Sequence, residues 1–314
     1  MKILSLLFSA VLLLISACIL VAVFVVASIM MLPDVHLLET CFTTGMYQVH
    51  LCPGSDSYVN LKDISPYVLH AVIVSEDGSF YTHDGFDWHE MEESLNADLQ
   101  SGHFRRGGST LTQQLAKNAF LDKEKSLWRK LKEAYLAHAI EKHYTKNFIL
   151  EKYLNVVEFG EDIYGVKAAA SHYFHKAPRD LNPLEAAYLA FLLPNPKGYS
   201  KSFRAGKLTP FARKMVSVIL KRMSAYGKLS PDGYQAAMAE LPNFPWSGLS
   251  NNNFRNAPSA NLEVLPPAGA PAAAAAAEPQ EDEKLLDELY NEDEGKPDSV
   301  GTGAAPAAPP TDTN

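Results

Sequence analysis

The chain of 314 residues is long enough for one large domain or two small ones, and its composition favours one domain with an extension at each end. The net charge of −8 is unevenly distributed, because residues 257–314 hold twelve acidic and two basic side chains, which leaves residues 1–256 at +2. The negative net charge of the whole chain therefore says little about what residues 1–256 bind. We expect no nucleic acid among the partners.

Residues 3–32 form the first predicted element, an apolar run without a charged side chain. As a helix that rises about 1.5 Å per residue, this run would reach roughly 45 Å, which is ample to cross a bilayer. We therefore predict a transmembrane anchor over residues 1–32, with Lys2 on the cytoplasmic side and the rest of the chain outside. A cleaved signal peptide fits less well, because its apolar region is about half as long and an A-x-A site would follow it.

The three cysteines leave alternatives open. Cys18 ends the sequence ISAC, which resembles a lipoprotein processing box, but the apolar run continues for fourteen residues beyond it. A cysteine buried in the anchor is therefore favoured over a lipidated one. Cys41 and Cys52 lie in a predicted connector over residues 33–62, where they could close a disulfide, although two free thiols would give the same sequence.

Residues 63–248 show long helical patterns and few alternating ones, which predicts one mainly α-helical domain. One helix start is especially clear: Asn182 suits the N-cap, Pro183 the first helical position and Glu185 the third, and Pro194 ends the run. The AAYLAFLL body of this helix is apolar on nearly every side. Such a helix belongs in the core.

Residues 249–314 are rich in alanine and proline and strongly acidic. This composition cannot bury enough apolar surface to offset the entropy of ordering, so we predict a disordered tail. A partner protein could bind a short helical pattern within it, and the simpler alternative is a solvated acidic tail. The pattern consists of Leu285, Leu286, Leu289 and Tyr290.

Three clusters carry residues suited to chemistry, and the first is HAVIVSEDGSF. The apolar run Ala71–Val74 predicts a buried element that brings Glu76 and Asp77 to its end. A carboxylate at the mouth of an apolar segment has a raised pKa, which suits a general base. Paired acids also occur in ordinary caps and turns, so this cluster alone does not decide the function.

The second cluster is RRGGSTLTQQLAKN, residues 105–118. Thr110 and Gln113 fit a capping box, and a glycine-led helix N-terminus offers amide donors to an anion. Gln113 and Lys117 lie four residues apart and share one helix face. A well-capped surface helix is the alternative.

The third cluster spans residues 123–160 and predicts two helices, the second capped by Thr145. Leu127, Leu131, Ala134, Leu136 and Ile140 are expected to bury one side of the first helix. Basic and acidic side chains repeat every four residues along its flank, which on an ordinary surface helix would be a weak stabilising pattern. These side chains are Lys125, Arg129 and Glu133.

Together, the clusters resemble the peptidoglycan glycosyltransferases of glycosyltransferase family 51. The matching motifs are E-D-x-x-F-x-x-H-x-G from Glu76, G-G-S-T-x-T-Q-Q-L-x-K-N from Gly107, R-K-x-x-E from Arg129 and Y-L-N-x-x-x-F-G from Tyr153. The sequence FDW after the first motif is most similar to the monofunctional branch, and no S-x-x-K motif of a transpeptidase occurs in the chain.

The resemblance implies a lysozyme-like fold with a smaller membrane-proximal jaw subdomain. It also implies polymerisation of lipid II into glycan strands, with undecaprenyl pyrophosphate released. Glu76 would be the general base, and Glu133 would organise the cations or hold a divalent metal, Mg²⁺ or Mn²⁺. The implied pyrophosphate-binding residues are Lys117, Gln113, Gln114, Ser109, Thr110, Lys125, Arg129 and Asn118.

One position departs from the family pattern. Lys125 stands where most relatives have arginine, so this site keeps the charge but loses the bidentate guanidinium. Two other functions stay open. Lys125 and the Leu/Tyr pattern of the tail prompt a catalytically weak scaffold of the wall-building machinery, and the implied lysozyme-like fold with its glutamate prompts a lytic transglycosylase. The resemblance further implies a single-pass protein of the bacterial inner membrane, whose periplasmic domain meets lipid II, the nascent glycan strand and the bilayer.

Overall fold

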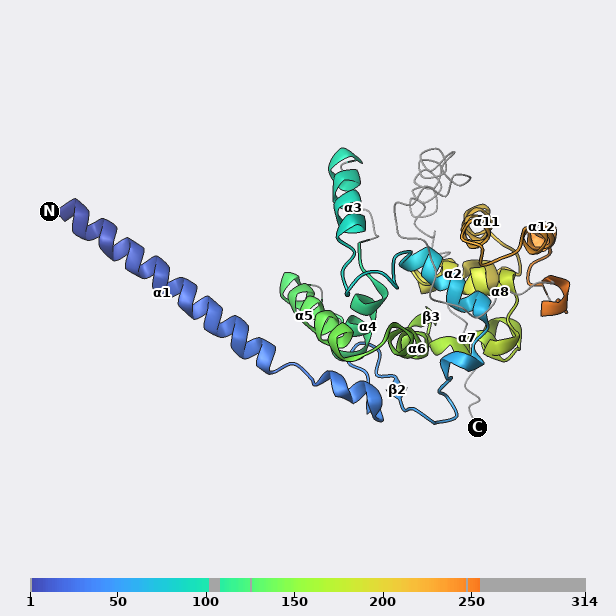
Figure 1. Cartoon of the computed structure of the whole chain (residues 1–314), viewed down its shortest axis with the longest axis horizontal. Helices are drawn as coiled ribbons and strands as arrows, with labels where there is room; N and C mark the ends of the chain where they lie inside the picture. Colours follow the sequence, from blue (N-terminus) through green and yellow to red (C-terminus); the bar gives the residue numbers. More distant parts are fainter. Residues whose placement is uncertain (1, 102–107, 125, 247, 255–314) are drawn as a thin grey trace, which may run out of the picture. The chain divides into compact units, whose positions relative to one another are not determined.

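The structure is a computed structural model, and it describes residues 2–101, 108–124, 126–246 and 248–254 (Figure 1). Within these residues the protein is mainly helical, with two short antiparallel hairpins. This agrees with the mainly α-helical class expected from the sequence. The smaller jaw subdomain stays a prediction.

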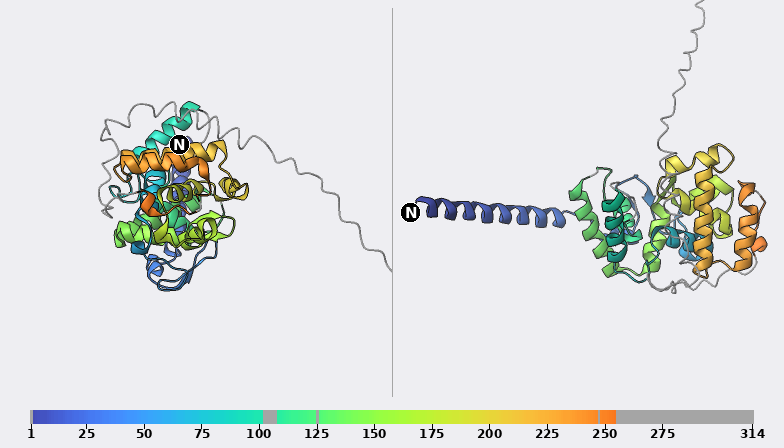
Figure 2. Two further views of the ribbon diagram at one scale, coloured as in Figure 1. Left: turned by 90° about the vertical axis from the view of Figure 1, so that its right-hand side faces the viewer. Right: turned by 90° about the horizontal axis from the view of Figure 1, so that it is seen from above.

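The N-terminal helix α1 (Lys2–Met30) is one continuous helix, as the right-hand view of Figure 2 shows. Most of this helix lies in Leu7–Glu39, the one described segment that is long and apolar enough to cross a membrane, with a mean hydropathy of 3.2. Large apolar side chains from Leu7 to Phe24 are exposed, as expected of a helix whose surroundings are lipid. The helix thus has the length and composition expected of a membrane anchor.

The predicted connector contains more structure than its irregular sequence indicates. A 3₁₀ helix (η1, Val35–Glu39) leads into the hairpin of β1 (Phe42–Thr43) and β2 (His50–Leu51). A disulfide joins Cys41 to Cys52 across the base of this hairpin. The hairpin then packs on α4 (Leu111–Phe120), because Gly45 N donates to Ala119 O at 2.8 Å. The connector is therefore part of the folded body.

Three helices form the main core. Helix α2 (Pro66–Glu76) packs along α8 (Pro183–Leu192) and α11 (Pro210–Ala225). Every residue of α8 is buried, and Asn182 and Glu185 form its capping box, so the sequence prediction for this helix is confirmed. Elements η2 (Leu61–Asp63), α12 (Pro231–Glu240), η4 (Leu241–Asn243) and η5 (Asn251–Phe254) complete this part.

A second group of helices surrounds α4, which packs against α5 (Leu127–His143) and α6 (Lys146–Val156). This arrangement brings residues from α4, α5 and α6 close to the end of α2, where the candidate site lies. The remaining elements are α3 (Trp88–Ser101), β3 (Glu158–Gly160), β4 (Ile163–Tyr164), α7 (Gly165–Phe174), η3 (Pro178–Asp180), α9 (Pro196–Tyr199) and α10 (Lys201–Arg204).

One sequence prediction about α5 is wrong. Leu136 and Ile140 are buried, but Leu127 and Leu131 are 88% and 60% exposed. Leu127 precedes Leu136 by nine residues, and Leu131 precedes Ile140 by the same interval. Because successive residues turn by about 100°, nine residues place the two members of each pair on opposite sides of the helix. The five apolar residues therefore never formed a single face.

The packed chain also extends beyond the predicted domain end at residue 248. Lys176 Nζ donates to Leu249 O at 2.6 Å, and Phe254 is 1% exposed. The sequence signal for the tail begins only at about residue 257, so the composition gave no reason to place the boundary earlier. The predicted helical pattern at 285–290 lies outside the described residues.

Candidate active site

Glu76 is the last residue of α2, and the burial of that helix explains the environment of its carboxylate. Residues 67–74 are all buried, so the helix runs through the core and ends with Glu76 half-buried. Burial raises the pKa of Glu76, while the hydrogen bond from Gln114 and the charge of Lys117 oppose the rise. Such a carboxylate is more basic than an exposed one, which suits proton abstraction.

Gln114 of α4 is the hydrogen-bond partner of Glu76. Its Nε2 lies 2.9 Å from Glu76 Oε2, and its Oε1 accepts from the hydroxyl of Tyr153 at 3.1 Å. The family resemblance places Gln114 at the pyrophosphate, whereas the structure directs its amide to the carboxylate. Three elements, α2, α4 and α6, therefore meet through these side chains.

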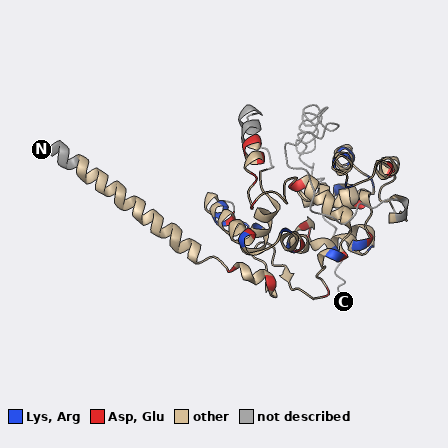
Figure 3. Ribbon diagram, in the orientation of Figure 1, with Lys and Arg blue, Asp and Glu red and all other residues tan. Residues whose placement is uncertain are grey.

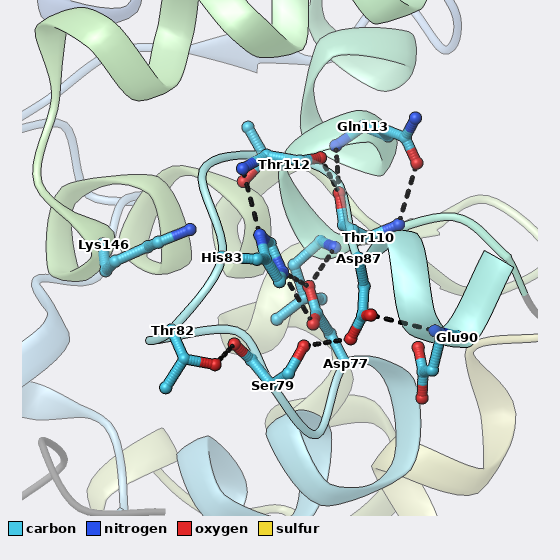
Figure 4. A network of polar contacts seen from close by, with 12 residues as sticks. Asp77, Ser79, Thr82, His83, Asp87, Glu90, Thr110, Thr112, Gln113 and Lys146 are labelled. Atoms are coloured by element: carbon cyan, nitrogen blue, oxygen red, sulfur yellow. Dashed lines mark hydrogen bonds and ion pairs between the residues drawn. The ribbon is translucent and has the colours of Figure 1, made fainter. Parts of the chain in front are cut away.

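Asp77 and His83 hold the loop that follows α2 (Figure 4). The Asp77 carboxylate accepts from Leu111 N at 2.8 Å and from His83 Nε2 at 2.9 Å. His83 Nδ1 accepts the backbone N–H of Gly85 at 3.0 Å, so the proton of the neutral ring is on Nε2. These bonds fix the segment after Glu76 to the first turn of α4.

A second set of contacts closes the same loop (Figure 4). Ser79 donates to Asp87, and Asp87 Oδ1 accepts from Glu90 N at 2.9 Å in the first turn of α3. Thr110 Oγ1 donates to Gly85 O at 2.8 Å. The motif that begins at Glu76 thus supplies one base candidate, and several of its other polar residues build the loop.

Thr110 and Gln113 form the capping box predicted for α4. Gln113 N donates to Thr110 Oγ1 at 3.2 Å, and Thr110 N donates to Gln113 Oε1 at 3.0 Å. Gln113 is only 2% exposed, so its side chain is directed to its own helix end. Both residues therefore have architectural contacts in the structure, and their predicted contacts with pyrophosphate stay predictions.

Glu133 is buried, and its charge acts on Lys117 of α4 as well as on its own helix α5. Figure 3 shows several Lys and Arg positions, in blue, along α5. Lys130 Nζ lies 2.5 Å from Glu133 Oε1 and 2.8 Å from Ser109 Oγ. Burial lowers the pKa of Lys117, Glu133 opposes this most strongly, and Arg129 adds to the lowering. We call the three basic side chains near Glu133, those of Lys117, Arg129 and Lys130, the cationic group.

The cationic group has donors that the described protein does not use. Arg129 Nε is buried without a hydrogen-bond partner among the described residues. The side-chain oxygen of Asn118, the residue after Lys117 in α4, is a buried acceptor that also has none. No described residue forms a hydrogen bond or ion pair with the Lys117 ammonium. Buried polar groups are normally paired, so unused guanidinium and ammonium donors in one place indicate a site for an anion.

Residues 47–224, more than half of the chain, match the transglycosylase family. The chain belongs to this family. A biosynthetic peptidoglycan transglycosylase of Aromatoleum aromaticum is 41% identical over 197 residues, which are 56% of this chain and 85% of the relative. Proteins with the same name come from Nitrosospira multiformis, at 39% over 168 residues (54% and 71%), and Acinetobacter baylyi, at 43% over 150 residues (48% and 67%).

Membership of the transglycosylase family confirms the lysozyme-like fold expected from the motifs. The matched range includes the whole α2–α6 arrangement with Glu76 and the cationic group. It also begins at residue 47, inside the hairpin that the sequence had placed in a connector. The family thus extends over the part of the chain that builds the candidate site.

The residues around Glu133 do not by themselves fit a dedicated divalent-metal site. Mg²⁺ and Mn²⁺ need several oxygen ligands, and a protein usually supplies one or two carboxylates beside the phosphates of a substrate. Here the Glu133 carboxylate is paired with Lys130, and the charges that surround it are positive. Among the described residues the one cluster with ligand spacing is Cys41, His50 and Cys52, whose cysteines form the disulfide. We derive no step through a metal.

The structure brings together most of the predicted site residues of this transglycosylase. Lys117 is within electrostatic reach of both glutamates, so it connects the base with the cationic group. Lys125 lies outside the described residues. Sequence reasoning missed two contributors, Lys130 and Tyr153. Lys130 stands three residues before Glu133 and was detectable from that spacing, whereas the contact of Tyr153 with Gln114 joins residues 39 apart and had no local signal.

Proposed function

We propose that this transglycosylase polymerises lipid II into peptidoglycan glycan strands by an inverting transfer. The observation that carries the proposal is a half-buried glutamate linked through Lys117 to a cationic group with unused donors. Glycosyl transfer from a pyrophosphate donor needs a base for the acceptor hydroxyl and an anion site for the leaving group, and both lie together here.

Glu76 acts on the acceptor. Its carboxylate takes the proton from the 4-hydroxyl of the acceptor GlcNAc as that oxygen bonds to C1 of the donor MurNAc. A sugar hydroxyl is a poor nucleophile at neutral pH, and a positioned carboxylate typically contributes about 10²- to 10⁴-fold to such a step. The raised pKa of Glu76 makes the carboxylate a better proton acceptor.

The cationic group acts on the leaving group. The bond between C1 and the pyrophosphate oxygen breaks, its electron pair stays on that oxygen, and undecaprenyl pyrophosphate departs. Lys117 and Arg129 stabilise the developing negative charge with donors that no described residue occupies. Glu133 and Lys130 hold the group together, and Ser109 is drawn in by its bond to Lys130.

A divalent cation at Glu133 stays a separate proposal. If Mg²⁺ or Mn²⁺ takes part, most of its oxygen ligands come from the pyrophosphate and water, because Glu133 offers one carboxylate that already pairs with Lys130. Adding a chelator to the polymerisation assay tests this. Loss of activity that Mg²⁺ restores supports the cation, and unchanged activity removes it.

The anchor fits a substrate whose lipid stays in the bilayer. Helix α1 keeps the catalytic residues near a membrane, and we infer that this is the bacterial inner membrane with the domain on its periplasmic side. The disulfide between Cys41 and Cys52 supports an oxidising compartment. Further wall-synthesis partners of the acidic tail are a prediction on residues outside those described.

Incubation with labelled lipid II tests the proposed reaction. We expect glycan chains that lengthen with time, and we expect the Glu76→Gln variant to polymerise about 10²- to 10⁴-fold more slowly. Shortening of preformed glycan without chain growth would instead show the lytic transglycosylase. Full cellular function of Glu76→Gln, with the tail intact, would favour the scaffold.

A further inference from the structure

Tyr153 is a tyrosine whose hydroxyl lies in the interior beside the proposed base. It belongs to α6, and 0% of its surface is exposed. Its hydroxyl donates to Gln114 Oε1 at 3.1 Å, and Gln114 Nε2 donates to Glu76 Oε2 at 2.9 Å. A phenylalanine would fill the same space without a polar atom to satisfy, so packing alone does not explain the hydroxyl.

The two neighbours of Gln114 decide which way its amide faces. An ionised Glu76 can only accept hydrogen bonds, so it needs the amide NH₂ on its side. The amide oxygen then faces Tyr153, where the phenol donates to it. The reverse orientation would place the amide oxygen against the carboxylate and repel it. A phenol can also accept from an amide NH₂, but no other described residue accepts the Tyr153 proton, so the reverse orientation would leave that buried proton without a partner. The phenol therefore favours the one orientation in which the amide stabilises an ionised Glu76.

We propose that Tyr153 is a positioning residue that acts on Glu76 through Gln114. By fixing the amide, it keeps the carboxylate ionised and aimed at the acceptor hydroxyl. This proposal rests on the proposed function, because it concerns Glu76 as the base. It assigns to the tyrosine of the Y-L-N sequence a role in the transfer chemistry as well as in packing.

The surroundings of Tyr153 keep its hydroxyl protonated, so that a proton is always present to donate. Burial and the nearby charges of Glu76 and Asp77 raise the pKa of Tyr153 well above its ordinary value. The phenol is thus protonated at every pH at which the protein works. Gln114 is also fixed at its backbone, because its N–H donates to Thr110 O at 2.9 Å, so the amide can change only by rotating its side chain.

The test is the pH dependence of polymerisation by the full-length Tyr153→Phe variant. Without the phenol donor the amide loses its preferred orientation, and Glu76 is protonated at a higher pH than in the native protein. We expect the acid limb of the kcat profile to move to higher pH. Activity in the acid range should fall by about 3- to 10-fold, with a smaller loss on the alkaline plateau.

Tyr173→Phe is the matched control. Tyr173 is also buried, at 3% exposure, and its hydroxyl donates to Phe159 O at 2.8 Å, away from the proposed base. Both substitutions remove one buried hydroxyl that donates one hydrogen bond. We expect Tyr173→Phe to lower thermal stability about as much as Tyr153→Phe, without moving the acid limb.

A double substitution tests whether Tyr153 acts through Gln114. Gln114→Met removes the amide, so it should move the acid limb in the same direction, and adding Tyr153→Phe should cause no further shift. An unmoved acid limb in Tyr153→Phe overturns the inference, and so does an unmoved limb in Gln114→Met. If Glu76→Gln keeps native activity, the proposed function fails instead, and the two failures are distinguishable. Should Tyr153→Phe not fold, the Gln114→Met profile alone decides, because an unchanged limb there also contradicts the inference.

Discussion

The two glutamates of the site are held by different kinds of partner. Glu76, at the end of a buried helix, receives a neutral amide from Gln114. Glu133, on α5, receives the ammonium of Lys130 and faces a cationic group. A base must keep a proton affinity high enough to remove a proton from a hydroxyl, and direct pairing with a cation would reduce that affinity. The difference indicates that Glu76 exchanges protons, while Glu133 organises charge.

Lys117 interacts electrostatically with both glutamates, so we expect its substitution to have the largest effect on activity. A small effect would contradict the division of roles between the two glutamates. Lys117→Met should reduce kcat by about 10²- to 10³-fold, the usual cost of losing one donor to a developing negative charge. The measurement is the rate of lipid II polymerisation at saturating substrate. Lys201→Met, at an exposed position on α10, is the control and should keep native activity. A loss below threefold at Lys117 would remove it from the leaving-group site.

A smaller effect is expected at Glu133. Glu133→Gln removes the negative charge that holds Lys117, Arg129 and Lys130 together, so their mutual repulsion loosens the anion site. We expect kcat/KM to fall by about 10- to 100-fold, as for the loss of a charged hydrogen bond. The pH dependence of kcat should stay native. An acid limb that disappears in this variant would show that Glu133, and not Glu76, exchanges the proton.

The smallest effect on activity is expected at His70, which shares α2 with Glu76. Burial, with the charge of Lys228, lowers the pKa of His70 to about 4, and its Nε2 is unpaired. The unfolded chain takes up this proton near pH 6.5, whereas the folded chain does so only near pH 4. The contribution of His70 to the free energy of unfolding should therefore be greatest above pH 6.5 and decrease as the pH falls toward 4.

His70→Leu tests whether the acid limb reports on Glu76, because it separates unfolding in acid from protonation of the base. The substitution removes the titrating group, so the melting temperature should vary less between pH 6.5 and 4 than in the native protein. The acid limb of polymerisation should remain, because Glu76 is unchanged. If the limb and the melting curve change together, the loss of activity in acid reflects unfolding.

Short-range features of the fold could be predicted from the sequence, because their partners lie within a few residues. The capping boxes at Thr110 and Asn182 and the delivery of Glu76 by a buried segment are of this kind. The exposure of Leu127 and Leu131 was missed because apolar residues were counted without their angular positions.

Contacts between distant elements were not predictable from local pattern. Gln113 and Gln114 are adjacent in sequence, and the family resemblance implied that both bind pyrophosphate. In the folded chain Gln113 caps its own helix, while Gln114 turns to Glu76. That difference depends on Tyr153 and Glu76, which reach α4 from two other helices. Helix packing therefore decides the role of each glutamine.

The most direct test of the division between the two glutamates is the pH profile of kcat for the native protein measured beside Glu133→Gln. Because burial raises the pKa of Glu76, activity should fall as the pH decreases through a value above that of an exposed glutamate. We predict this same acid limb in both proteins, with a lower absolute rate in Glu133→Gln. An acid limb that is present in the native protein and absent from Glu133→Gln would contradict this prediction.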